Sequence, residues 1–268
     1  MKIRRIKFQK LKNTRDLGGY VSSDGRVIRD KMLIRSGSLF KASEDDLKKL
    51  CDEYNLSTII DLRIEAEIKE KPDPEIDGVR YIHIPLLDKA YLGITRDEYS
   101  IKTWFNIFSD ASRRPEDVFY DMYEMLVFGE RTKTLFPQIF SILAEDNAEA
   151  VLWHCSAGKD RVGVTTMLIL LALGIDRETI IEDFLATNRF SSAEIIKTRV
   201  FAPLVIKERR LRKCLAILMG VKREYMDRLF LKIDKEFCSI EDFFMKQYGI
   251  DENMLNSLRD KFLVKGEV

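Results

Sequence analysis

The sequence has few of the residues that build metal centres, disulfide frameworks or membrane spans. It holds two histidines, His83 and His154, too few for a histidine-rich metal centre. Its four cysteines are widely spaced and form no paired motif for zinc or for disulfides. No apolar run is long enough to span a membrane, and no apolar core follows the basic N-terminus. We therefore expect a cytoplasmic, reduced chain without a membrane span.

Neither sign of charge predominates. The chain has 45 basic and 44 acidic residues, a formal net charge of +1, so nothing global points to nucleic acid and any attraction to an anion must be local. With 268 residues, of which 46% are hydrophobic, the chain can bury one good core. We expect a single domain over residues 1–268.

The stretch from Val151 to Gly163 predicts a strand, a tight loop and a helix in succession. Residues 151–153 are an apolar run typical of a strand, and Gly158 lets the backbone turn. The apolar residues 165–173 continue as a helix that stops at Gly174. Cys155 is therefore expected just ahead of a helix N-terminus.

That position suits the binding and cleavage of a phosphate ester. The unpaired N–H groups from Ser156 to Arg161 and the helix dipole form a cradle for phosphate oxygens. A helix N-terminus also lowers the pKa of a thiol from about 8.5 to roughly 3.5–7.5, so we expect a thiolate at Cys155. Arg161 can reach back to hold two phosphate oxygens with its planar fork.

The spacing of Cys155 and Arg161, with five residues between them, resembles the phosphate loop of the cysteine-dependent phosphatases in the protein-tyrosine phosphatase superfamily. The loop also matches a bacterial branch with the pattern His-Cys-x-Ala-Gly-Lys-Asp-Arg, here His154, Cys155, Ala157, Gly158, Lys159, Asp160, Arg161 and Gly163. Residues 13–20, residues 61–63 and the helical tail look like the same branch. The resemblance implies hydrolysis through a phosphocysteine intermediate, without metal or cofactor.

The resemblance also implies roles for the residues beside the nucleophile. His154 would order the loop through a hydrogen bond, or it is simply a buried strand histidine. The leaving oxygen needs a proton from an acid on the side opposite the thiolate. Asp160 fills that role in this branch, while Asp88 resembles by position the acid of other members. We favour Asp160 slightly, and the two could share the work.

One position departs from the superfamily. A Ser or Thr usually follows the loop arginine and helps the thiolate leave, whereas this chain has Val162. We expect a slower second step, and Thr165 and Thr166 are expected to be helix-packing residues rather than substitutes. Because Val162 lacks that hydroxyl, the chain could alternatively be a phosphate-binding module with little turnover.

The remaining chain predicts an α/β fold with a mostly parallel central sheet and helices on both faces. Buried strands are expected at residues 57–62 and 79–85, and a hairpin over residues 13–34. Amphipathic segments indicate an inserted helical region at residues 90–147, part of which could form a lid, and a helical C-terminal part at residues 191–268. Arg63 is expected to form a structural ion pair with Asp61 or Glu67.

The substrate class is less determined than the chemistry. By resemblance, the first choice of substrate is a protein that carries phosphotyrosine, and phosphoserine and phosphothreonine are additional candidates. Lys159 and the basic run at residues 197–213 favour a phosphoinositide, with transient contact to a lipid surface, as the second choice. An enzyme like arsenate reductase would instead need a partner thiol from Cys51, Cys214 or Cys238.

Overall fold

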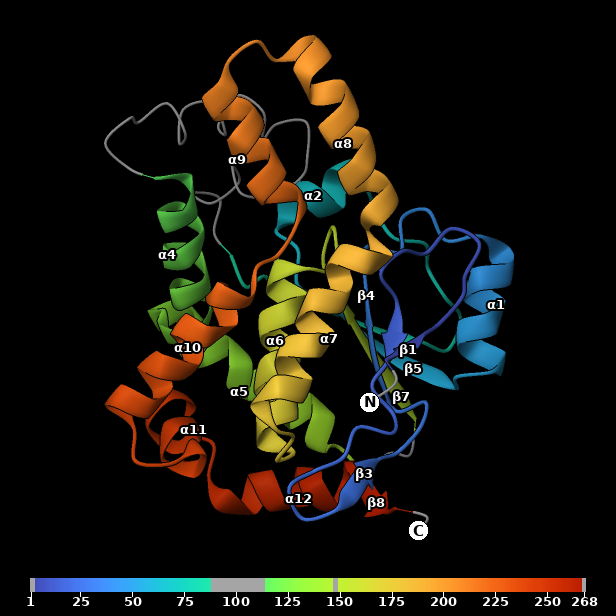
Figure 1. Cartoon of the computed structure of the whole chain (residues 1–268). Helices are drawn as coiled ribbons and strands as arrows, with labels where there is room; N and C mark the ends of the chain where they lie inside the picture. The colour runs from blue at the N-terminus through green and yellow to red at the C-terminus, as the bar shows by residue number, and fades with distance from the viewer. Residues whose placement is uncertain (1–2, 88–113, 147–148, 267–268) are drawn as a thin grey trace.

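A mixed six-stranded sheet lies at the centre of the chain, in a computed structural model that describes residues 3–87, 114–146 and 149–266 (Figure 1). The strand order is β1-β2-β4-β7-β5-β6. The strands are β1 Arg4–Arg5, β2 Arg15–Asp16, β4 Leu33–Ser36, β7 Ala150–His154, β5 Leu56–Asp61 and β6 Arg80–His83. Strands β4, β7, β5 and β6 are parallel, whereas β1 and β2 are antiparallel additions at one edge. The expected α/β fold with a mostly parallel sheet is confirmed.

Helices cover both faces of this sheet. They are α1 Glu44–Asp52, α2 Glu65–Glu70, α4 Pro115–Phe128, α5 Glu130–Ala144, α6 Asp160–Ala172, α7 Arg177–Phe190, α8 Ser192–Val205, α9 Arg209–Met219, α10 Arg223–Glu236, α11 Ile240–Tyr248 and α12 Glu252–Phe262. Among the described residues, none of the helices combines the length and apolarity needed to cross a membrane.

The central strand β7 shows how the two cores arise. Side chains alternate along a strand, so Ala150 and Leu152 point to one face, where they join Leu50 of α1. Val151 and Trp153 point to the other face and join the large cluster built by α4–α7 and α9–α12. All of β7 is buried because it is covered on both sides. Burial on both faces explains why residues 151–153 are all apolar.

The carboxyl ends of three parallel strands meet at one point. In register, His154 of β7 lies beside Ser36 of β4 on one side and Asp61 of β5 on the other. In open α/β sheets, ligands bind at this edge of the strands. The residue that follows His154 is Cys155, so the topology delivers the candidate nucleophile to that edge.

The described part of the predicted insert is core rather than lid. Four aromatic side chains of α4 and α5 are at most 1% exposed, namely Phe119, Tyr123, Phe136 and Phe140. They pack on rings of the C-terminal helices, as Phe140 does on Phe244 with 5.5 Å between centroids. The rest of the insert, residues 90–113, lies outside the described residues, so the possible lid stays a prediction. Asp88 lies outside them as well.

One expectation differs from the structure near residue 264, and another is met near residue 24. The helical C-terminal part closes with a strand, β8 Leu263–Lys265, rather than staying helical. This strand pairs antiparallel with β3 Arg26–Ile28. The expected hairpin within residues 13–34 is present, because Val21 and Val27 form an antiparallel bridge and Ser22 N–H donates to the Arg26 carbonyl at 2.8 Å across the turn. The pairing of β3 with the distant β8 is an addition that the sequence analysis did not predict.

Candidate active site

The candidate nucleophile lies where the sequence predicted it. Cys155 follows β7, is 2% exposed, and lies five residues ahead of Asp160, the first residue of α6. We call residues 155–161 the phosphate loop. Gly158 has φ +65°, and a Cβ there would lie 2.6 Å from the Ser36 carbonyl oxygen. Only glycine fits this turn without strain.

Two side chains hold carbonyl groups of the phosphate loop from outside. The Asn13 amide donates to the carbonyls of Ala157 at 3.2 Å and Gly158 at 2.7 Å, and Arg35 donates to the Gly158 carbonyl at 3.0 Å. In a trans peptide the N–H points opposite to the C=O. The N–H groups of Gly158 and Lys159 therefore point away from Asn13 and Arg35, as an anion cradle requires.

Asp183 of α7 fixes the two arginines behind the loop. It accepts a hydrogen bond from Arg15 Nε at 2.9 Å and pairs with Arg35, and all three side chains are at most 1% exposed. The Tyr20 hydroxyl donates to the same carboxylate at 3.0 Å. Burial would raise the pKa of Asp183, but the two guanidinium groups outweigh it and hold this pKa below its usual value. Burial, with the charge of Arg15, lowers the pKa of Arg35 to about 10, so Arg35 stays charged at neutral pH.

Arg161 is held by the carboxylate of Glu67, one of the two partners expected for Arg63. Its terminal nitrogens contact the two carboxylate oxygens of Glu67 at 2.6 and 2.7 Å, and Ser156 donates to the same carboxylate. Burial opposes ionisation of both partners, yet their mutual attraction lowers the pKa of Glu67 and raises that of Arg161. Glu67 is thus a support of the phosphate loop and not the partner of Arg63.

Asp160 and Lys159 point at one another at the start of α6. The Lys159 ammonium lies 3.0 Å from an Asp160 carboxylate oxygen, and the buried Tyr123 hydroxyl donates to Asp160 at 2.6 Å. Burial, reinforced by the charge of Asp160, raises the pKa of Tyr123 well above its usual value, so Tyr123 remains a hydrogen-bond donor. Because Asp88 lies outside the described residues, its distance from the loop stays untested.

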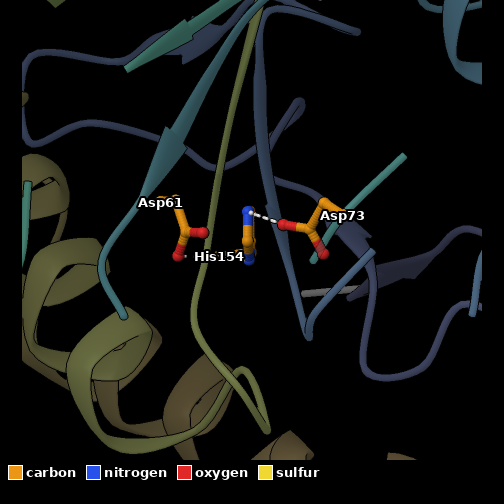
Figure 2. Close-up of side chains that lie close together, drawn as sticks. All are labelled: Asp61, Asp73 and His154. Atoms are coloured by element: carbon orange, nitrogen blue, oxygen red, sulfur yellow. Dashed lines mark ion pairs between the residues drawn. The ribbon is translucent and has the colours of Figure 1, made fainter. Parts of the chain in front are cut away.

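His154 lies between two carboxylates, as Figure 2 shows. Its Nε2 is 3.1 Å from Asp73 Oδ2, and its Nδ1 is 3.8 Å from Asp61 Oδ1 on the opposite side of the ring. One nitrogen of Arg63 contacts Asp61 at 2.7 Å and Asp73 at 2.5 Å, which confirms the expected Arg63–Asp61 ion pair. Burial would raise the pKa of Asp61, but His154 and Arg63 lower it.

These three residues have potential metal-ligand atoms within 4.8 Å of one another. However, the two carboxylates approach opposite edges of the His154 ring, whereas chelation needs donors that converge on one point. The guanidinium of Arg63 already supplies both carboxylates with a positive charge. We therefore interpret the cluster as a support for the end of β7.

The hydroxyl groups near Val162 are engaged within the helix. Thr165 donates to the Arg161 carbonyl at 2.9 Å, and Thr166 donates to the Val162 carbonyl at 2.7 Å. Trp153 donates to the Thr166 hydroxyl at 3.1 Å. These bonds confirm that both threonines are helix-packing residues. All four cysteines are free thiols.

A sequence model of the tyrosine phosphatase family matches residues 6–264. The chain belongs to this family. A Cupriavidus necator protein named "Putative tyrosine-protein phosphatase H16_A0669" is 25% identical over 258 residues, which covers 92% of this chain and 85% of the relative. The triple specificity protein phosphatase PtpB of Mycobacterium tuberculosis is 26% identical over 261 residues, covering 86% of this chain and 92% of PtpB.

Among solved structures, TpbA of P. aeruginosa is similar to this chain at 12% sequence identity and a TM-score of 0.30. The match covers 80% of this chain and 97% of that one. At this score the overlap supports no statement about the present chain.

The buried Asp183 predicts a large loss of stability when its charge is removed. Asp183→Asn leaves Arg15 and Arg35 without a counter-charge, and the expected loss is about 3–5 kcal/mol in the free energy of unfolding. Asp234→Asn is the matched control, because its ion pair with Arg177 is exposed and should change stability by less than about 1 kcal/mol. Urea denaturation measures both, and equal losses would contradict the prediction.

The lowered pKa of Asp183 also gives a pH dependence with a definite sign. A carboxyl whose folded pKa lies below its unfolded value stabilises the fold above that unfolded value, here 3.8. That contribution is lost as the pH falls through the lower, folded pKa. The unfolding free energy of the wild type should therefore fall more steeply below pH 3.8 than that of Asp183→Asn.

Proposed function

We propose that this chain is a protein-tyrosine phosphatase in which Cys155 is the nucleophile and Arg161 the phosphate-binding side chain. The main support is the combination of Cys155 ahead of α6 with loop carbonyls held outward by Asn13 and Arg35. Thiolate, amide donors and guanidinium then face one phosphate group. A preorganised set of donors of this kind stabilises charge that develops in a transition state.

The pairing of Arg161 with Glu67 leaves hydrogen-bond donors for the substrate. A guanidinium has five N–H groups, and Glu67 takes one from each terminal nitrogen. Nη1 also approaches the Leu62 carbonyl at 3.4 Å. The Nε–H and the second N–H of Nη2 form a parallel pair on the adjacent edge, which suits two phosphate oxygens.

The reaction would proceed in two steps. The Cys155 thiolate attacks phosphorus, a sulfur–phosphorus bond forms, and the bond from phosphorus to the leaving oxygen breaks. Arg161 and the amides of residues 156–161 hold the phosphate oxygens, and an acid protonates the leaving oxygen. Water then attacks the phosphorus of the phosphocysteine and gives a proton to the carboxylate that the acid became in the first step. The sulfur–phosphorus bond breaks, which releases phosphate and restores the thiolate.

Asp160 is the proposed acid, with Asp88 as the alternative. Asp160 belongs to the phosphate loop itself, and its carboxylate is positioned by Lys159 and Tyr123. His154 is proposed to orient the first residue of the loop through its position between Asp61 and Asp73. The free thiols suit a reducing compartment, and we propose a cytoplasmic location.

A phosphoinositide phosphatase is the second candidate, favoured by the surface of α8. Four large apolar side chains of this helix are 58–76% exposed, namely Ile196, Val200, Phe201 and Leu204. Basic residues follow at 207–213. An exposed apolar face beside cations fits an anionic lipid surface. Figure 1 shows α8 and α9 at the top of the view, where they lie side by side.

Steady-state phosphate release tests the proposed function. We expect multiple turnovers on a phosphotyrosine peptide in the presence of chelator, and loss of activity by at least about 1,000-fold in Cys155→Ser, because the hydroxyl is a far weaker nucleophile. A phosphoserine peptide and a monophosphoinositide, measured alongside, rank the substrate classes. Unchanged turnover in Cys155→Ser would overturn the mechanism.

The same assay distinguishes the two alternatives to an efficient phosphatase. A single burst of product without turnover would mean that hydrolysis stalls at the phosphocysteine, as a phosphate-binding module with Val162 predicts. A redox enzyme needs a resolving thiol, so joint replacement of Cys51, Cys214 and Cys238 would then abolish activity. The phosphatase mechanism predicts that this triple variant keeps its turnover.

Tyr123→Phe tests whether Asp160 acts as the acid. Loss of the 2.6 Å bond should release the carboxylate and lower kcat for an alkyl phosphate, a poor leaving group, by about 10-fold. For p-nitrophenyl phosphate, whose leaving group needs little protonation, the change should be less than about 3-fold. Asp160→Asn should show the same pattern more strongly. An equal loss on both substrates in both variants would assign the acid elsewhere.

Leu204→Glu tests the lipid surface. Leu204 is 76% exposed on α8, and a carboxylate there should reduce binding to anionic vesicles by about 5-fold or more. Leu231→Glu on α10 is the control, since Leu231 is also exposed, at 67%. Sedimentation with vesicles measures both variants. Equal binding by both would remove α8 as a lipid contact.

A further inference from the structure

A lysine-lined hollow of about 250 Å³ borders the phosphate loop at Ser156 and Ala157. Its walls come from segments far apart in the sequence, because they include residues 10–12, residues 37–41 and the α2 region. Its four lysines are Lys10, Lys12, Lys41 and Lys71. We call this cavity the lysine hollow. None of these lysines belongs to the phosphate loop or contributes to the proposed reaction.

The charge of the lysine hollow is positive after its ion pairs are considered. Arg63 also lines it, but Asp61 and Asp73 outweigh its charge by one, and Glu67 is neutralised by Arg161. The lysines outnumber this single excess negative charge. Lys71 lies 2.8 Å from Glu70, which offsets one further charge. Across residues 3–87, 114–146 and 149–266, no carboxylate forms an ion pair with Lys10 or Lys41. An excess of fixed positive charge in a concave site attracts anions.

The backbone that carries these lysines is fixed relative to the phosphate loop. The buried carboxylate of Asp46 accepts from the backbone N–H of Gln9 at 2.7 Å, Lys10 at 2.8 Å and Leu11 at 3.2 Å. The Lys12 carbonyl accepts from Gly37 N–H at 3.1 Å. The backbone positions of Lys10 and Lys12 on the rim of the hollow are therefore defined, although the lysine side chains are long.

We propose that the lysine hollow binds a second phosphate group of a doubly phosphorylated peptide, while the first phosphate occupies the loop at Cys155. This proposal rests on the proposed phosphotyrosine phosphatase function and adds a preference among its substrates. The second phosphate is held as an anion and is not cleaved there, because the hollow contains no nucleophilic cysteine.

The size and lining of the hollow favour a peptide side chain over a lipid. At about 250 Å³ it lies below the range of about 300–1,000 Å³ typical of drug-sized ligand pockets, so it suits a single phosphorylated side chain. The ring of Phe40 lies in the wall and is 38% exposed, which offers an apolar contact to that side chain. The apolar face of α8 does not line the hollow.

A pair of peptides tests the proposal on the wild-type protein. One peptide carries a single phosphotyrosine, and the other carries the same phosphotyrosine with a phosphothreonine nearby. We expect kcat/KM for phosphotyrosine hydrolysis to be about 5- to 20-fold higher for the doubly phosphorylated peptide, mainly through a lower KM. Because exposed charges are screened by salt, this ratio should fall toward one at 1 M NaCl.

Variants then locate the effect. Lys10→Ala and Lys41→Ala should each reduce the ratio about 2- to 5-fold, and the double variant should nearly abolish it. Lys48→Ala is the matched control, since Lys48 is exposed on α1 and does not line the hollow. The control should keep the wild-type ratio.

The outcomes separate this proposal from the function on which it rests. No turnover of p-nitrophenyl phosphate, which has no second anion, would overturn the proposed function itself. Normal turnover with equal kcat/KM for both peptides would overturn only the second-phosphate site. A preference seen with soluble inositol bisphosphate over monophosphate, but absent with the peptides, would replace the peptide by an inositol phosphate.

Discussion

Outward-facing carbonyl groups of the phosphate loop are the feature on which the site depends. A loop of peptide groups can present N–H donors to an anion only if the opposite ends of those groups are satisfied elsewhere. Asn13 and Arg35 provide that satisfaction, and Asp183 keeps Arg35 in place. A contact that lies behind the loop therefore determines what the front of the loop can bind.

The net charge of the ionic groups differs between the core behind the phosphate loop and the loop itself. Arg15 and Arg35 share one carboxylate, so the buried group behind the loop keeps a net positive charge. The pairs of Arg161 with Glu67 and of Lys159 with Asp160 are internally balanced. Balanced pairs orient their members at small electrostatic cost, while the unbalanced buried group supplies potential that attracts an anion.

The sequence predicted the parts of the site that are local in the chain. The run from β7 through Cys155 to α6 follows from apolar patterning and Gly158, and its match to a family pattern names the chemistry. The supports were not predictable in this way. Glu67, Asp73 and Asp183 are acidic residues that look like ordinary surface charges until the fold buries them.

A single sequence gives little indication that an acidic residue will be buried. Hydrophobic periodicity predicts which face of a helix or strand is buried, but it does not predict which residues a charged side chain will contact. Asn13 and Arg15 belong to a segment that resembles the family. Their roles behind the phosphate loop depend on contacts with Gly158 and Asp183, which are distant in the sequence. The hairpin at residues 19–28 was predictable from local turn residues. The pairing of β3 with β8 was not, since local turn signals cannot show that β3 also pairs with a strand more than 230 residues away.

The pairing of β3 with β8 has a consequence for how the chain acquires its structure. Backbone bonds reinforce that pairing, since Arg29 N–H donates to the Phe262 carbonyl at 2.8 Å, and Arg26 reaches Asp260 at 3.1 Å. A contact between such distant segments closes a very long loop, which slows folding. During synthesis from the N-terminus, β3 cannot pair with β8 until residues 263–265 have been synthesised. A strand at residues 263–265 thus completes a sheet begun at residues 26–28.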